Sequence, residues 1–143
     1  MQAAAVPLKL EFDVAEVQGP GEFDSAFASM AKRRVDAVVV TEDGEFAASF
    51  GAIAALAATN NLASIGAQEY AQAGGLIGYG VDLLGLYRRA AYFVDKILKG
   101  AKPADLPIEQ PTRFELVINL KTAKTLGLEI APAMLARADE IIE

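Results

Sequence analysis

The feature that most constrains the fold is a glycine-rich run, Ala73-Gly74-Gly75-Leu76-Ile77-Gly78-Tyr79-Gly80, which holds four glycines within seven residues. Glycines this close together indicate a place where the backbone bends sharply or approaches another group closely. The run lies between a short predicted strand and a long predicted helix at residues 82–99, which Gly100 ends. We therefore expect a crossover beside a ligand cleft rather than a plain surface loop.

Strand and helix patterns alternate along the chain. Residues 8–17 alternate apolar and polar side chains, which is typical of a strand with one wetter face near a sheet edge. Residues 35–40 are rich in valine, which is typical of a strand buried on both faces of a parallel sheet. We expect the other strands at residues 62–65, 75–79 and 114–119, and helices at 22–34, 46–60, 68–72, 82–99, 120–126 and 132–142. This alternation predicts an α/β fold, a single domain over residues 1–143 in which helices flank a mainly parallel sheet.

The helix expected at residues 82–99 is more apolar than a surface helix requires. Two apolar stripes lie side by side along it, where an ordinary surface helix needs one apolar face of about 100°. The helix lies either in a deep core of its own domain or with one side against another lobe or subunit. The hydrophobic fraction of 53% favours apolar surface that is meant for a partner. The first stripe holds Leu84, Tyr87, Ala91, Val94 and Leu98, and the second holds Leu83, Leu86, Ala90, Phe93 and Ile97.

The composition excludes several kinds of chemistry. The chain has no cysteine and no histidine, which removes disulfides, thiolate metal sites and the commonest general base. Its net charge of −6 argues against a nucleic-acid partner, because binding phosphates needs clustered lysine and arginine. The longest apolar run falls far short of a membrane span, so we expect no membrane insertion. We therefore expect no catalytic residue, no metal and no cofactor.

Several sequence blocks follow one another in a specific order. They are residues 73–80, 87–91, 94–100 and 102–107, followed by a tail at residues 114–123 and 126–128. In these blocks the chain resembles the substrate-binding proteins of ABC transporters, a family with bilobed, type I periplasmic-binding folds. The resemblance covers residues 35–143 as the carboxyl-terminal part of the family, and residues 8–34 fit less distinctively, as a strand and helix of its second lobe.

The resemblance implies a two-lobed protein that closes on a small molecule, such as an amino acid, without catalysis and delivers it to an ABC permease. A full member has roughly twice this length, as expected for two domains of ordinary size. The chain then lacks the first lobe and the first strand of the second lobe. Residues 74–80 would be one of three segments that pass between the lobes, and the helix within residues 81–100 would pack on the missing lobe or on a partner subunit.

A single lobe of this kind would expose half a cleft, an unpaired sheet edge and one side of the long helix. Self-association is the simplest way to cover these surfaces, and we expect a two-fold homodimer with the helix at residues 82–99 in its interface. A purely structural or regulatory homodimer without a ligand, the product of a truncated gene, is the alternative function.

A flavodoxin-like or nucleotide-binding enzyme is a second and weaker alternative. No Gly-x-Gly-x-x-Gly motif follows the first predicted strand, and no Gly-Lys-Ser or Gly-Lys-Thr phosphate loop occurs. Glu42 and Asp43 are adjacent carboxylates, but neighbouring residues at a strand end point apart. We therefore do not expect an enzyme.

Candidate ligand-binding residues follow the predicted strands, because ligands of parallel α/β sheets bind beyond the carboxyl ends of the strands. These residues are Thr41, Asp43 and Gly44 after one strand, Gly66 after the next, and Tyr79 at the third. The resemblance implies that Asp43 meets a ligand amino group, while capping of the following helix is an equally good explanation of this residue. Tyr79 either stacks on a ligand or fills the seam between lobes.

The resemblance also implies a periplasmic location. The first seven residues, Met1-Gln2-Ala3-Ala4-Ala5-Val6-Pro7, lack the basic region and the long apolar core of a secretory signal. A cytoplasmic location therefore stays open.

Overall fold

One five-stranded sheet organises the molecule. In the computed structural model, which describes residues 2–143, the strands lie in the order β1-β2-β3-β4-β5. Neighbouring strands are parallel except for β3 and β4, which are antiparallel. The predicted α/β fold with a mainly parallel sheet is confirmed. The strands are β1 (Ala37–Val39), β2 (Ala63–Gly66), β3 (Ile77–Val81), β4 (Phe114–Asn119) and β5 (Glu140–Ile142).

The helices follow the predicted order with three differences: a short helix at Gln2–Ala5 precedes the first predicted one, one predicted helix is divided in two, and the last is shorter. The helix expected at residues 46–60 is two helices that meet at Ser49. The first begins at Gly44, because the side chain of Asp43 accepts a hydrogen bond from the Glu45 N–H. The helices are α1 (Gln2–Ala5), α2 (Phe23–Lys32), α3 (Gly44–Ala48), α4 (Phe50–Thr59), α5 (Gln68–Gln72), α6 (Leu83–Leu98), α7 (Leu120–Thr125) and α8 (Pro132–Leu135). Three short 3₁₀ turns are η1 (Val6–Leu8), η2 (Pro20–Glu22) and η3 (Pro103–Asp105).

The prediction of a last helix through residue 142 is wrong. The helix ends at Leu135, and residues 140–142 form β5 beside β4. Asp139 fixes this pairing from both sides, because its N–H donates to the Leu116 carbonyl and its carboxylate accepts from the Leu116 N–H, each at 2.8 Å. Pairing with β4 decides the conformation of a segment whose own pattern looks helical.

The prediction of a strand at residues 8–17 is also wrong. Residues 10–17 form neither a helix nor a strand, and no sheet ladder joins them to another strand within residues 2–143. Val17 packs on the core, and Asp13 forms an ion pair with Arg33 at the end of α2. The alternating pattern alone does not produce a strand here, because the described chain offers no strand beside this segment.

The hydrophobic core lies on one face of the sheet, here called the core face. Phe50 and Tyr70 meet edge to face there, with ring centroids 5.5 Å apart. Burial raises the pKa of the Tyr70 hydroxyl, and a smaller opposite effect comes from Ser64. The buried cluster joins α2, α4 and α5 to β1 and consists of Phe23, Phe27, Val40, Phe50, Ile53, Ala54, Ala57, Leu62 and Tyr70.

The opposite face, here called the second face, is apolar but only partly covered. The pairing register aligns Val39, Ile65, Ile77 and Ile118 on it. Ile118 is fully buried, whereas Val39 is 49% exposed. The prediction that residues 35–40 form a strand buried on both faces is therefore wrong for β1, which is the edge strand and is open on this face.

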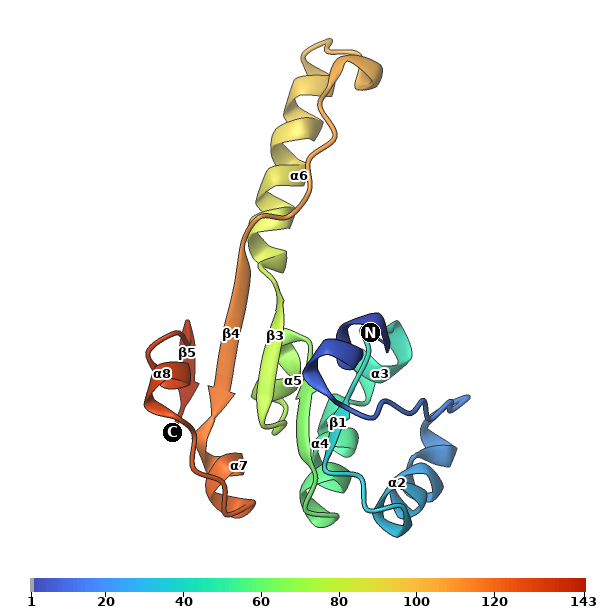
Figure 1. The fold of residues 1–143 in the computed structure, drawn as a ribbon. Helices are drawn as coiled ribbons and strands as arrows, with labels where there is room; N and C mark the ends of the chain where they lie inside the picture. Colours follow the sequence, from blue (N-terminus) through green and yellow to red (C-terminus); the bar gives the residue numbers. More distant parts are fainter. Residues whose placement is uncertain (1) are drawn as a thin grey trace.

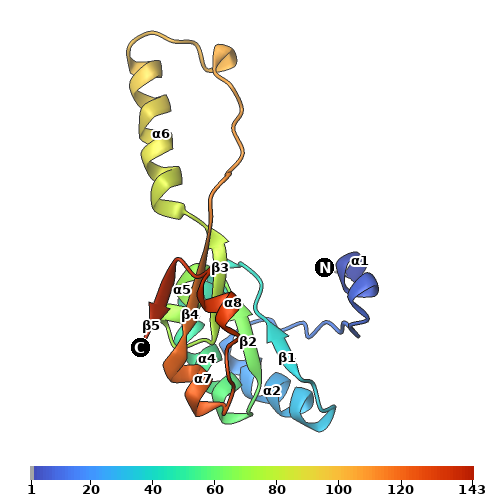
Figure 2. The ribbon, with the colours of Figure 1, turned by 60° about the vertical axis from the view of Figure 1, so that its left-hand side comes forward.

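The long helix α6 projects beyond the end of the sheet. Figures 1 and 2 show α6 and its return segment, residues 99–113, standing away from the remaining elements. None of the residues of α6 is buried, and Leu84, Tyr87 and Leu98 are 66–82% exposed. The interpretation that α6 lies in a deep core of its own domain is therefore wrong. Arg89 and Glu109 form a bidentate ion pair that ties the return segment to the helix.

Candidate ligand-binding site

A hollow of about 460 Å³ lies at the carboxyl ends of the parallel strands. It is open to solvent and is bounded by the turn after β1, the start of α5 and the last residues of β3. This is the place where parallel α/β sheets bind ligands. Its lining consists of Glu42, Asp43, Gly44, Ala47, Phe50, Ala67, Gln68, Glu69, Gly80, Val81 and Leu83.

Two glycines of β3 position one wall of the hollow. A Cβ atom on Gly78 would lie 2.5 Å from the main-chain oxygen of Gln68, and one on Gly80 would lie 3.3 Å from the Gln68 nitrogen. A larger residue at Gly78 would push the start of α5 away from the sheet. The glycine-rich run therefore permits the close approach that its composition predicts, and it brings Gln68 and Glu69 to the hollow.

The charge of the hollow is negative. Glu42, Asp43 and Glu69 contribute carboxylates, and the lining contains no lysine or arginine. The Gln68 side-chain amide already has a partner in the protein, since its Nε2 donates to the Glu115 carboxylate at 2.6 Å. Glu115 is itself paired with Arg113 at 3.0 Å, so the carboxylates of the lining are the charges left for a ligand. A positively charged group such as an ammonium is the chemistry that this surface favours.

The structure places the five predicted residues in different surroundings. Asp43 and Gly44 line the hollow. Asp43 also caps α3, so its capping role is confirmed while its ligand contact stays a prediction. Thr41 is exposed just before the lining residues and is not one of them. Gly66 has a packing role, because a Cβ there would lie 2.8 Å from the Tyr70 ring.

Tyr79 lies away from the hollow. Its neighbours in β3, Gly78 and Gly80, face α5, so the Tyr79 side chain is on the second face. There it stacks on Phe114, with ring centroids 5.7 Å apart, and remains 52% exposed. Gly80, one residue further along, is the residue of this strand that reaches the hollow.

Sequence reasoning missed Glu42, Gln68, Glu69 and Gly80 as lining residues. For Glu42 the signal was present, because it follows β1 directly at the carboxyl end of the strand. For Gln68 and Glu69 the signal is that they follow the end of β2 within three residues. Only the approach of α5 to β3 shows that these residues face the same space as Asp43.

Metal and membrane features are absent from the described part of the chain. Within residues 2–143 no cluster of carboxylates is arranged to hold a metal ion. No helix there combines the length and the hydropathy that crossing a bilayer requires.

Solved structures with this arrangement are periplasmic-binding-like domains about twice as long. A conserved domain protein from Vibrio cholerae O1 biovar El Tor is 25% identical, with a TM-score of 0.88 over 98% of this chain and 47% of that chain. The ABC domain from Streptococcus pneumonia in complex with L-Trp is 28% identical, with a TM-score of 0.87 over 98% and 48%. A ligand-free, open substrate-binding protein with adhesive properties from Clostridium difficile shares the fold at 19% identity, with a TM-score of 0.71 over 99% and 47%.

The chain therefore spans about half the length of these structures and has the fold of periplasmic-binding-like domains. Residues 2–142 match the family of ABC transporter substrate-binding proteins, and the chain belongs to this family. No curated protein matches the chain.

Proposed function

We propose that the chain forms one lobe of a solute-binding protein that serves an ABC uptake transporter, and that it binds a small molecule with a positively charged amino group without catalysis. The observation that carries this proposal is the acidic hollow at the carboxyl ends of the strands, which is lined by Glu42, Asp43 and Glu69. Membership of the substrate-binding family supports a solute-binding role. A permease partner and a periplasmic location follow from that role.

The ligand class that we propose is an amino acid. Its ammonium group would face the carboxylates of the hollow. Asp43, at the turn after β1, is the carboxylate that we propose binds it. Since the lining carries no positive side chain, the carboxylate of the amino acid would be bound by groups outside this lobe. The bound L-Trp in the structure of the Streptococcus pneumonia ABC domain supports this ligand class.

A titration with free amino acids tests the proposal. We expect an amino acid, with L-Trp as the first choice, to raise the melting temperature of the full chain. The Asp43→Asn variant keeps a good helix cap but loses the charge, so its affinity should fall about 10- to 100-fold, the value of a charge-assisted hydrogen bond. Asp105→Asn on the remote turn η3 is the matched control and should bind like the unmodified chain.

Two results would overturn this proposal. One is that no amino acid changes the melting temperature at millimolar concentration. The other is that 3-indolepropionic acid, which lacks the amino group of L-Trp, binds as well as L-Trp, since the carboxylates would then contribute nothing.

A structural homodimer is the second candidate function, and the surface of α6 favours it. Leu84, Tyr87, Val94 and Leu98 form an exposed stripe along the helix. We propose that this stripe packs on a second lobe or, in a self-associated form, on α6 of a second copy. Light scattering tests the dimer. Leu98→Glu should yield a monomer, whereas Ile108→Glu, at a residue 99% exposed on the return segment, should not. A monomeric unmodified chain at micromolar concentration would exclude the homodimer.

A further inference from the structure

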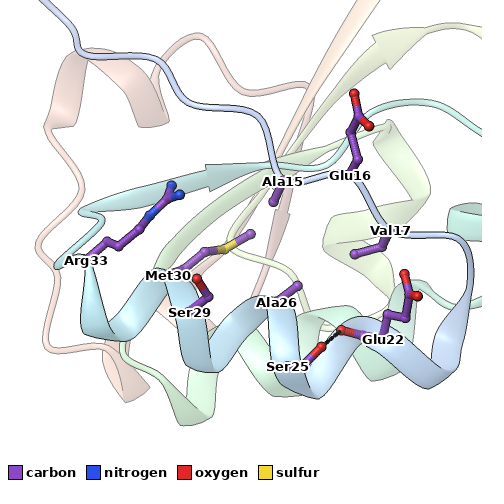
Figure 3. A pocket seen from close by; sticks show the side chains of 9 residues that line it. All are labelled: Ala15, Glu16, Val17, Glu22, Ser25, Ala26, Ser29, Met30 and Arg33. Atoms are coloured by element: carbon purple, nitrogen blue, oxygen red, sulfur yellow. Dashed lines mark hydrogen bonds between the residues drawn. The ribbon is translucent and has the colours of Figure 1, made fainter.

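The hollow beside α2, which measures about 340 Å³ and is open to solvent, uses several of its polar groups within the protein (Figure 3). Ser25 Oγ donates to the Glu22 carbonyl at 2.8 Å, and Arg33 forms an ion pair with Asp13. The acidic hollow at the carboxyl ends of the strands differs in one respect. Its lining residue Gln68 has a partner that uses only the donating end of its side-chain amide.

Glu115 reaches Gln68 across a strand position that has no side chain. In the ladder between β3 and β4, Glu115 is paired with Gly80, and paired residues of an antiparallel ladder point to the same face. A Cβ atom on Gly80 would lie 3.3 Å from the Gln68 nitrogen, so this is the face that α5 covers. The glycine therefore leaves room for the Glu115 carboxylate to accept from Gln68 Nε2 at 2.6 Å.

Glu115 sets the orientation of the Gln68 amide. An amide has a donating and an accepting end, whereas a carboxylate only accepts. The NH₂ end of Gln68 must therefore face Glu115, and its carbonyl oxygen Oε1 must point elsewhere. Arg113 pairs with the second oxygen of the Glu115 carboxylate at 3.0 Å, and the Glu115 side chain is only 17% exposed. Both carboxylate oxygens thus have partners in the protein, which holds the Gln68 amide in one orientation.

The hollow is the space left for the Gln68 carbonyl oxygen. Gln68 is a lining residue of the hollow, and Glu115 is not. The Glu42 carboxylate lies close by, because the same Cβ position on Gly80 would be 3.3 Å from Glu42 Oε1. A carboxylate after β1 and an amide at the start of α5 therefore flank one wall of the hollow, and both offer hydrogen-bond acceptors.

An amide oxygen beside a carboxylate distinguishes between cations of equal charge. A primary ammonium has three N–H donors, whereas a quaternary ammonium carries the same charge and has none. A carboxylate attracts both cations through its charge. The neutral amide oxygen forms a hydrogen bond with the primary ammonium alone, so the orientation of the Gln68 amide affects which cation binds more tightly.

We propose that Gln68 recognises the ligand by accepting one N–H of its ammonium group at Oε1, and that Glu115, paired with Arg113, is the positioning residue that directs this oxygen into the hollow. The site thereby selects a primary amine over an N-methylated one. This inference rests on the proposed function and deepens it, because it assigns residues that read the amino group beside the carboxylates.

The affinities for L-Trp and for its Nα-trimethyl derivative test the role of Gln68. The chain contains no tryptophan, so indole fluorescence reports the ligand alone. Gln68→Met removes both ends of the amide, and L-Trp should bind about 10- to 100-fold more weakly, as expected for the loss of a hydrogen bond to a charged group. The preference for L-Trp over the trimethyl derivative should narrow by about tenfold. Extra bulk weakens the derivative in both proteins alike, so the narrowing isolates the hydrogen bond.

Gln72→Met is the matched control for this variant. Gln72 lies on the same helix but outside the hollow, and its Nε2 also donates to a glutamate, Glu140, at 3.3 Å. Its replacement should change neither the affinity for L-Trp nor the preference over the trimethyl derivative.

Glu115→Gln tests the positioning role. Arg113 only donates, so the new amide at position 115 should turn its oxygen to Arg113 and its NH₂ end to Gln68. Gln68 would then turn its own NH₂ end to the hollow, and L-Trp should bind about 10- to 100-fold more weakly. In a chain that already carries Gln68→Met, the same change should add less than about twofold, because Glu115 acts through Gln68.

The side-chain amide signals in nitrogen–proton NMR spectra give a readout that needs no ligand. The Gln68 signal, identified by its loss in Gln68→Met, should move in Glu115→Gln, whereas the Gln72 signal should not. An unmoved Gln68 signal would overturn the positioning role of Glu115.

The binding measurements separate this inference from the proposed function. L-Trp binding that Gln68→Met leaves unchanged would overturn the inference and leave the proposed function standing. An equal loss from Glu115→Gln with and without Gln68 would also overturn it, since Glu115 would then act through its charge alone. If no amino acid binds, the proposed function fails first, and the recognition role of Gln68 fails with it.

Discussion

Replacing Gly78 by alanine is the sharpest test of how β3 and α5 build the hollow. The added Cβ would lie 2.5 Å from the Gln68 oxygen and 3.0 Å from the Ala67 oxygen. Both are main-chain atoms of the turn that starts α5, so the strain is not relieved by rotating a side chain. Forcing extra volume into a packed site typically costs about 1–3 kcal/mol. Alanine also lowers the conformational entropy of the unfolded chain relative to glycine, and this offsets about 0.4–1 kcal/mol of that cost.

We therefore expect Gly78→Ala to lower the free energy of unfolding by about 1–2 kcal/mol. For a chain of this size, that loss corresponds to a fall of about 2–8 °C in the melting temperature. Urea and thermal unfolding of the full chain measure both quantities. The ligand titration described above should show weaker binding as well, because Gln68 and Glu69 would move away from the hollow.

Gly44→Ala is the matched control. A Cβ at Gly44 meets no atom within 4 Å, and the residue lies at the start of α3, where alanine is the better helix former. This variant should be unchanged or more stable by up to about 1 kcal/mol. Equal stability of the two variants would refute the reasoning that the approach of α5 to β3 depends on the absence of a side chain at Gly78.

Three further predictions concern the core, the return segment and α7. Tyr70→Phe should be neutral or stabilising by up to about 1 kcal/mol in urea unfolding, because no described residue forms a hydrogen bond of normal geometry with the buried Tyr70 hydroxyl, and the nearby Ser64 hydroxyl instead accepts from the Leu76 N–H. A clear loss of stability would show that Ser64 bonds the Tyr70 hydroxyl. Arg89 holds the pKa of Glu109 below its usual range, so the stabilising contribution of this pair is complete above the unfolded carboxyl pKa of about 4.3 and is lost as the pH falls through the lowered folded value. The protection of residues 106–113 from hydrogen exchange, measured relative to the intrinsic rate at each pH, should then fall at acid pH, and Glu109→Gln should show the low protection already at pH 7. Asn119→Ala should lower the free energy of unfolding by about 1–3 kcal/mol, because the side chain caps α7 through the Thr122 N–H and donates to the buried Ala71 carbonyl. The control is Thr125→Ala, which removes an exposed hydrogen bond and should change the free energy of unfolding by less than about 0.5 kcal/mol.

The chain pattern predicted most elements because their signals are local. The valine-rich β1, the apolar period of α2 and the capped helix α6 depend on residues within a few positions of one another. Asp82 accepts a hydrogen bond from the Gly85 N–H at 2.8 Å, so residues 82–85 alone specify where α6 begins. Its end is equally local, at Gly100 with a φ of 98°.

The elements that were predicted wrongly are those that a distant partner decides. Residues 140–142 become a strand because β4 lies beside them, with Asp139 and Leu116 exchanging hydrogen bonds. Residues 9–17 have the alternation of a strand but form no ladder, since no strand of the described chain lies next to them. Pairing between strands joins residues far apart in sequence, so the pattern of one segment does not fix it.

The candidate site divides in the same way. Asp43 and Gly44 were found from the sequence because they follow a recognisable strand, and such positions lie at the ligand end of a parallel sheet. Tyr79 was expected at the end of its strand, but β3 continues to Val81, and the alternation of side chains along β3 turns Tyr79 to the second face. Glu69 was missed because only the packing of α5 on β3 brings it to the hollow.

The sequence by itself determined the α/β class, the position of the glycine-rich strand β3, the caps of the long helix and the acidic character of the chain. Composition, period and local hydrogen bonds are properties of short segments. The tertiary structure alone decided which face of the sheet is covered, that α6 projects from the sheet instead of entering the core, and which carboxylates share one hollow. These features depend on how strands pair and how closely α5 approaches β3, and such contacts join parts of the chain that no local pattern relates.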